Sequence, residues 1–171
     1  KIAAPSVFLS GNGPLVEVLR YELESRAMVM PMKSYLHDTW VKQKDKPPRE
    51  RVLIFDEAQR AWDRERVLEK HRGALADSEA VLLLSMADRV KDGFVVVALL
   101  GEGQEIHAGE ESGIAAWVEA AKKSGGWKVF GPVHLSQSFS GDGMNFISEP
   151  LFHLSASLRS HRALETSHWA A

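Results

Sequence analysis

Short apolar runs alternate with amphipathic stretches along the whole chain. Strand-like runs occur at residues 6–9, 52–55, 94–100, 127–130 and 152–158. The runs at 52–55 (VLIF) and 94–100 (FVVVALL) show no apolar–polar alternation, which is typical of strands buried on both faces of a parallel sheet. Helical segments separate the runs, so the pattern predicts an α/β fold with a mostly parallel sheet.

Helix signals occupy the intervals between these runs. Leu15, Val18, Leu19 and Leu23 fall on one helical face, directly after a turn in which Pro14 suits the first turn of a helix. The other predicted elements are a helix with an exposed loop over 33–51, a helix capped by Ser78 that carries 81–90, a helix over 113–123, and a loop or small hairpin over 136–148.

Composition narrows the functional classes. The 171 residues are 44% hydrophobic and 26% charged, which fits one globular domain with or without a short appendage. The net charge of −2 gives no global attraction to nucleic acid, so such binding needs a local groove. The absence of cysteine excludes a disulfide scaffold and is compatible with the reducing cytoplasm, where we expect the protein to act.

The ends of the chain and its apolar runs bear on its context. No apolar run approaches the roughly 20 residues of a membrane helix, so we expect no membrane association. The sequence starts with Lys1 and stops within a helix-like stretch, so we expect a fragment of a longer protein with a fused or partner domain.

The strongest chemical signal is residues 52–62, VLIFDEAQRAW. An apolar strand followed by Asp-Glu is the Walker B arrangement, because a buried strand releases two carboxylates at the carboxyl edge of the sheet. Asp56 is a candidate Mg²⁺ ligand, and Glu57 is a candidate to orient or deprotonate a water. The alternative is an ordinary strand end with solvated charges.

Two further segments follow predicted strands. In LLGEGQEIHAG (99–109), Gln104 offers an amide that both donates and accepts hydrogen bonds, which suits a group between a phosphate and a partner. In LSASLRSHR (154–162), Arg159 offers a planar guanidinium that binds phosphate oxygens. Taken singly, the first is better explained by a Gly-rich turn with a surface glutamine, and the second by solvated surface arginines.

Together, DEAQ, GEGQEI and SLRSH stand in the order and rough spacing of helicase motifs II, III and IV. The sequence resembles superfamily 1 DNA/RNA helicases, and more closely the Schlafen-related bacterial DNA/RNA helicase domain family of P-loop NTPases. That family characteristically shows strings such as VFLSGNGPLVEVLR and VLIFDEAQRAWDRERV, and both are present here. The resemblance covers roughly residues 5–165. It implies a three-layer RecA-like fold, with residues 1–171 as one partial lobe that leads from about residue 150 toward a second lobe.

The resemblance also implies residue roles. Asp56 and Glu57 would be the Mg²⁺ and catalytic carboxylates, and Gln104 would couple the γ-phosphate to a bound strand. Arg159 would stabilise the transferring phosphate, while Ser10 and Asn12 would touch single-stranded nucleic acid. The chain departs from the usual motifs at Glu102, where motif III usually has Asp, and at Ser157-Leu158, where motif IV usually has Asn-Tyr.

No G-x-x-x-x-G-K-[ST] loop occurs in the sequence. This loop cradles the phosphates in P-loop enzymes, so we expect this polypeptide alone to bind ATP weakly or not at all and to be inactive. In related folds its strand lies in the middle of the sheet. Its loss would therefore leave a central gap, unless other strands close up.

The intact protein is thus expected to hydrolyse ATP with Mg²⁺ and to couple this to single-stranded DNA or RNA. Two alternatives stay open: an NTPase switch that acts on proteins without translocation, and a non-catalytic binding or scaffold module. The five tryptophans are expected to pack in the protein rather than to stack bases, and the histidines show no metal-ligand spacing. A Ser136–His134–Asp142 triad has no supporting nucleophile elbow.

Overall fold

The computed structural model describes residues 6–26, 28–44, 46–101, 113–141 and 143–153. The chain forms two compact units, Lys1–Trp127 and Lys128–Ala171. The first unit holds a parallel four-stranded sheet and five α-helices, and the second holds a separate two-stranded parallel sheet. The predicted α/β class with a parallel sheet is confirmed.

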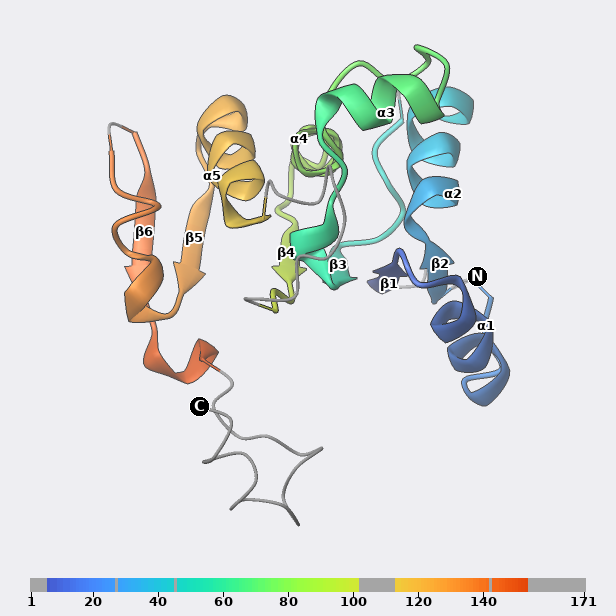
Figure 1. Ribbon diagram of the computed structural model, residues 1–171, viewed down its shortest axis with the longest axis horizontal. Helices are drawn as coiled ribbons and strands as arrows, with labels where there is room; N and C mark the ends of the chain where they lie inside the picture. Colours follow the sequence, from blue (N-terminus) through green and yellow to red (C-terminus); the bar gives the residue numbers. More distant parts are fainter. Residues whose placement is uncertain (1–5, 27, 45, 102–112, 142, 154–171) are drawn as a thin grey trace. The chain divides into compact units, whose positions relative to one another are not determined.

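The sheet of the first unit has the strand order β2-β1-β3-β4 (Figure 1). Its strands are β1 (Ser6–Ser10), β2 (Val29–Pro31), β3 (Val52–Asp56) and β4 (Val95–Ala98). Adjacent strands pair directly in parallel register, and β1 pairs with β3 along its whole length. Of the two outcomes expected for the sheet, these strands show the second: they close up without a central gap. The three-residue strand β2 was not predicted.

The helices of the first unit lie on both faces of this sheet. They are α1 (Gly13–Glu22), α2 (Met32–His37) with a π-helical turn at Asp38–Lys42, a 3₁₀ turn at Ala58–Arg60, α3 (Arg64–Lys70), α4 (Glu79–Ala87) and α5 (Gly113–Ser124). In Figure 1, α1 lies below the strands, while α2, α3 and α4 lie above them. Helix α3 was not predicted, and α4 stops before Val90. Among the described residues, no helix is both long and apolar enough to cross a bilayer.

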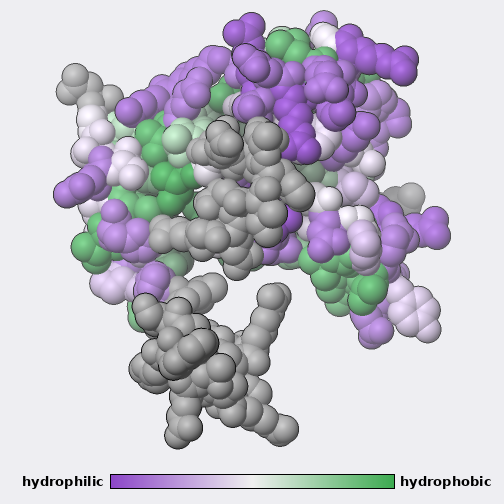
Figure 2. Space-filling view, in the orientation of Figure 1, coloured by the Kyte–Doolittle hydropathy of each residue, from purple (hydrophilic) through white to green (hydrophobic). Residues whose placement is uncertain are grey.

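Side-chain caps set the beginnings of α1, α3 and α4. The Asn12 side chain accepts a hydrogen bond from the Leu15 N–H and caps α1, a role that was not predicted. Ser78 caps α4 through the Val81 N–H, as predicted. The predicted apolar face of α1 was partly wrong, because α1 buries Val16 against the sheet and leaves Val18 58% exposed. Figure 2 shows hydrophobic residues at the surface over α1.

One face of the sheet forms the core of the first unit. Leu53 and Phe55 of β3 are buried, and the Trp117 ring of α5 lies 6.0 Å from the Phe55 ring. On the opposite face, Val95 and Val97 of β4 are 53% and 37% exposed. The prediction that 52–55 and 94–100 are buried on both faces was therefore wrong, because β4 is the edge strand of the described sheet and helix α1 packs on β1 and β2.

The second unit is built on β5 (Lys128–Gly131) and β6 (Asn145–Ser148). Short 3₁₀ turns occur at Val133–Leu135 and Pro150–Phe152, and the Phe139 and Phe146 rings stack 5.5 Å apart. The predicted strand at 127–130 is confirmed. The predicted loop or hairpin over 136–148 was wrong at its end, because β6 pairs in parallel with β5. Residues 152–153 are not a strand, and 154–158 lie outside the described residues.

Candidate functional site

The carboxyl ends of β1 and β3 meet at one edge of the sheet. Ser10, the last residue of β1, is opposite Asp56, the last residue of β3. The chain places β2 on one side of β1 and then returns to place β3 on the other side. The strand order therefore reverses between β1 and β3, and ligands of open parallel sheets bind outside the strand ends at such a position.

Asp56 is a half-buried carboxylate at this edge. Its burial raises its pKa above the ordinary value, and the neighbouring Glu57 raises the pKa further, while the Glu57 backbone N–H opposes the rise. A cation beside Asp56 would stabilise the charged carboxylate, because it offsets both effects. The donor fits Mg²⁺, which takes one or two protein carboxylates when phosphates and water supply the other ligands. The described residues contain no cluster of three or more acidic or histidine side chains that could hold a metal alone.

Glu57 has a left-handed backbone, with φ at 54°. This conformation is uncommon for a residue with a side chain and costs on the order of 1 kcal/mol or more. Neighbouring elements hold the turn: the Ala58 N–H donates to the Leu99 carbonyl at 2.8 Å, and the Trp117 indole N–H donates to the Ala58 carbonyl at 2.9 Å. Strain maintained in this way is concentrated at functional sites.

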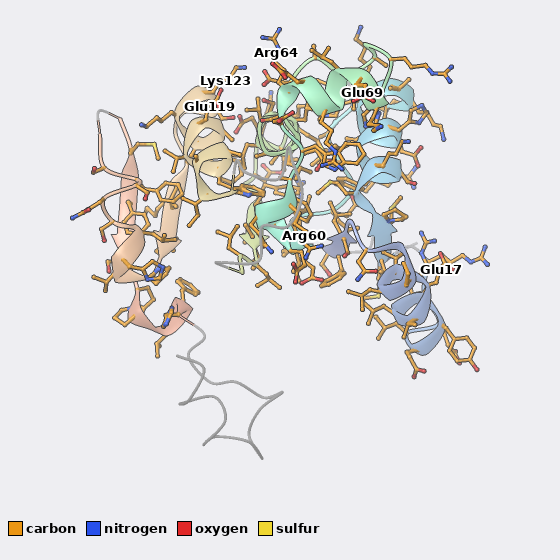
Figure 3. All side chains as sticks on the ribbon, viewed as in Figure 1. Glu17, Arg60, Arg64, Glu69, Glu119 and Lys123 are labelled. Atoms are coloured by element: carbon orange, nitrogen blue, oxygen red, sulfur yellow. The ribbon has the colours of Figure 1, made fainter. Side chains whose placement is uncertain are left out.

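The Glu57 carboxylate is held from one side and open on the other. Its Oε2 accepts a hydrogen bond from the Gln59 amide at 2.8 Å and forms an ion pair with the Arg60 guanidinium at 3.2 Å. Figure 3 shows Arg60 beside the end of β3. The Glu57 side chain is 39% exposed, so the carboxylate also has room to accept a hydrogen bond from a water.

Gln59 is the residue at this site whose position the sequence did not indicate. Its side chain is 3% exposed, and its carbonyl oxygen accepts a hydrogen bond from the Gly101 N–H at 2.9 Å. The DEAQ string singled it out, but no periodicity distinguishes a buried amide in a short turn from a surface amide.

Ser10 and Asn12 have structural roles at the same edge. Ser10 is buried, and its hydroxyl accepts a hydrogen bond from the Asn12 N–H at 3.1 Å. Asn12 is exposed and caps α1. The structure thus brings both residues to the edge that holds Asp56, and their contact with nucleic acid stays a prediction.

Gln104 and Arg159 lie outside the described residues, as does Asp142 of the rejected triad. Their convergence with Asp56 and Glu57 therefore stays a prediction. The four tryptophans within the described residues contact the protein, as expected. Trp40 donates to the Leu82 carbonyl, Trp127 to the Asp88 carboxylate and Trp117 to the Ala58 carbonyl, while the Trp62 ring lies against His71 and Arg66.

A comparison with protein-family models matches residues 3–171 to the family described as Schlafen group 3, DNA/RNA helicase domain. The chain belongs to this family. Searches of curated proteins and of solved structures found no match. Membership confirms the resemblance drawn from the sequence strings. A helicase domain implies a hydrolase that binds a nucleoside triphosphate and has DNA or RNA as its partner.

In this Schlafen group 3 helicase domain, two of the strings that carry the resemblance occupy neighbouring strands. VFLSGNGPLVEVLR runs through β1 into α1, and VLIFDEAQRAW runs through β3 into the 3₁₀ turn. Because β1 and β3 are paired, two motifs that are far apart in the sequence end at the same edge, at Ser10 and Asp56.

Proposed function

We propose that this domain is the core of a Mg²⁺- and ATP-dependent, superfamily 1-like enzyme with a RecA-like fold that couples hydrolysis to single-stranded DNA or RNA. One observation carries the proposal. Asp56 and Glu57 leave β3 at the carboxyl edge of a parallel sheet, opposite Ser10, where the strand order reverses. Carboxylates in this position suit phosphoryl transfer, in which catalysis is mostly positioning and electrostatics.

Each carboxylate has its own role in this proposal. Asp56 would hold the Mg²⁺, which neutralises charge on the phosphates when bound. Glu57 would orient the attacking water or take its proton, while Gln59 and Arg60 fix its carboxylate from the other side. By the resemblance, Gln104 and Arg159 would contact the γ-phosphate. The phosphate-binding loop is not in these 171 residues, so the proposal requires it from a segment outside them.

The first prediction tests Glu57 in the full-length protein. Glu57→Gln keeps the size and one acceptor oxygen but removes the negative charge. We expect kcat for ATP hydrolysis to fall by roughly 100-fold or more, the usual contribution of a positioned general base. Steady-state phosphate release measures it. Glu69→Gln on α3 is the matched control, because Glu69 is 69% exposed and lies away from Arg60 in Figure 3.

The same assay separates the alternatives. A helicase or translocase hydrolyses ATP faster when single-stranded DNA or RNA is added, whereas an NTPase switch that acts on proteins shows no such stimulation. A full-length protein that hydrolyses no ATP would favour the scaffold module. Unchanged turnover in Glu57→Gln would refute the catalytic assignment of Glu57.

A further inference from the structure

Gln59 connects two strand ends through one side chain. Its amide nitrogen donates to Glu57 Oε2 at 2.8 Å, and its carbonyl oxygen accepts from the Gly101 N–H at 2.9 Å. Glu57 follows β3, and Gly101 follows β4. A single buried amide therefore spans from the proposed catalytic carboxylate to the point where the chain leaves the neighbouring strand.

Neither bond is easily exchanged for a bond to water. Gln59 is 3% exposed, so a lost bond would leave a buried polar group unsatisfied. The bond to Glu57 has a charged acceptor, which makes it stronger than a neutral hydrogen bond. The orientation of the amide is also fixed, because only its nitrogen can donate to the carboxylate and only its oxygen can accept from Gly101.

The backbone is paired at the same point. The Leu99 N–H donates to the Phe55 carbonyl at 2.9 Å, and the Ala58 N–H donates to the Leu99 carbonyl at 2.8 Å. These bonds join the two backbone segments that follow β3 and β4, but neither bond involves the Glu57 carboxylate. Among the described residues, Gln59 supplies the side-chain link between that carboxylate and the end of β4.

We propose that Gln59 is a positioning residue that holds the Glu57 carboxylate in its reactive orientation and ties that orientation to the position of Gly101. The proposal rests on the proposed function. It makes hydrolysis dependent on where the chain leaves β4, because a shift of Gly101 moves the amide and the amide moves the carboxylate. An error of about 1 Å in such positioning costs up to about 100-fold in rate.

Two substitutions separate the two bonds. Gln59→Glu keeps an oxygen for the Gly101 N–H but replaces the donor to Glu57 with a second negative charge. Gln59→Met has a similar length and loses both bonds. Gln137→Glu is the matched control, since Gln137 is exposed and belongs to the second compact unit.

The experiment measures ATP hydrolysis and amide hydrogen exchange in the full-length protein. We expect both Gln59 variants to lower kcat by about 10- to 100-fold. We expect KM for ATP to stay within about twofold, since an interaction that acts only in the transition state changes kcat alone. Exchange at the Gly101 amide should accelerate in Gln59→Met and stay near the unmodified rate in Gln59→Glu. The control should match the unmodified protein in every measurement.

A purely structural role for Gln59 gives a different result. It would lower the melting temperature and the active fraction, without the difference in Gly101 exchange between the two variants. Equal Gly101 exchange in all proteins, or unchanged kcat in both Gln59 variants, would overturn the proposal. An unmodified protein without ATPase activity overturns the proposed function and the catalytic half of this proposal, while the exchange rates still confirm or overturn the tie between Gln59 and Gly101.

Discussion

Glu79 is a carboxylate in the first turn of α4 that is only 4% exposed. Its Oε2 accepts a hydrogen bond from the Trp62 N–H at 2.9 Å, and its own backbone N–H donates to the Trp62 carbonyl at 3.0 Å. Burial raises its pKa to about 7, although the bond to Trp62 and the charge of Arg66 act in the opposite direction. Glu79 thus binds both backbone groups of Trp62, which follows the 3₁₀ turn of the site.

This raised pKa predicts that stability falls as pH rises from about 4.5 to about 7, because the folded state keeps its proton when the unfolded state has lost it. Above pH 7 the folded protein has lost all of this stability, on the order of 3 kcal/mol at most. Glu79→Gln keeps an acceptor for Trp62 and removes the charge. We therefore expect the variant to be more stable than the unmodified protein at pH 8, by about 1–3 kcal/mol, and the advantage to vanish below pH 5.

Urea unfolding at pH 5 and pH 8 measures this effect. Glu69→Gln is again the matched control, because it makes the same substitution at an exposed carboxylate. An advantage of Glu79→Gln that is equal at both pH values would contradict the assignment of a buried, proton-binding carboxylate.

At the scale of single residues, the sequence reveals chemistry at strand ends better than chemistry inside turns. Asp56 and Glu57 could be predicted because an apolar run precedes them and defines their place at the sheet edge. Gln59 and Glu79 could not be assigned roles. A buried amide and an acidic residue in the first turn of a helix look the same in a sequence as their solvated counterparts, because their partners are backbone groups of distant residues.

Helix α1 follows directly on the turn that is proposed to contact single-stranded nucleic acid. Its N-terminus depends on Asn12, whose side chain accepts from the Leu15 N–H. The same residue is proposed to contact nucleic acid, so a substitution that removes its side chain would change helix capping and nucleic-acid binding together. Substitutions that differ in these two properties separate them.

Asn12→Ala removes the cap, and we expect it to lower stability by about 1 kcal/mol. Asn12→Asp keeps a capping oxygen and should leave stability nearly unchanged, but it adds a negative charge where a phosphate backbone would approach. We therefore expect Asn12→Asp to weaken the binding of single-stranded nucleic acid. We also expect the size of this weakening to depend on the salt concentration. Fluorescence anisotropy with a labelled oligonucleotide and thermal unfolding measure the two effects.

Asn145→Asp is the control for charge alone, because Asn145 is exposed on β6 in the second compact unit. Equal affinity of the Asn12→Asp variant and the unmodified protein would remove Asn12 from the proposed strand contact and leave it as a helix cap.

Helices and strands could be predicted where the local apolar pattern and the local hydrogen-bond partners indicate the same structure. β1, β3 and α4 have clear apolar runs or caps and were found. β2 is three residues long, and β6 lies in a Ser- and Gly-rich stretch and gains its strand conformation by pairing with β5. The sequence pattern also could not predict the exposure of Val95 and Val97, because strand order decides which apolar strand lies at the edge of the sheet.

At the scale of the whole molecule, the two carboxylates of the proposed nucleotide site are present in these 171 residues without the loop that cradles phosphates. No G-x-x-x-x-G-K-[ST] occurs in the 171 residues, whereas Asp56 and Glu57 are in place at the sheet edge. Two carboxylates repel a nucleoside triphosphate unless a cation and backbone N–H groups offset the charge.

We therefore expect the 171-residue chain alone to bind Mg²⁺-ATP only weakly, with a Kd above about 1 mM, equivalent to less than about 4 kcal/mol of binding free energy. Isothermal titration calorimetry at high protein concentration measures this, and a full-length protein that contains the loop provides the comparison. Millimolar or tighter affinity of the 171-residue chain would show that these residues hold the phosphates in another way.

Trp117 gives the protein an intrinsic optical probe. Its indole is 6% exposed, packs on the Phe55 ring and donates its N–H to the carbonyl of the residue that follows Glu57. Indole emission depends on the polarity and hydrogen bonding around the ring, so a rearrangement of the turn changes the fluorescence spectrum without any attached dye. In a variant that keeps Trp117 and replaces the other four tryptophans, stopped-flow recording of this emission can follow the motion of the turn in real time while a nucleotide or an oligonucleotide is mixed in.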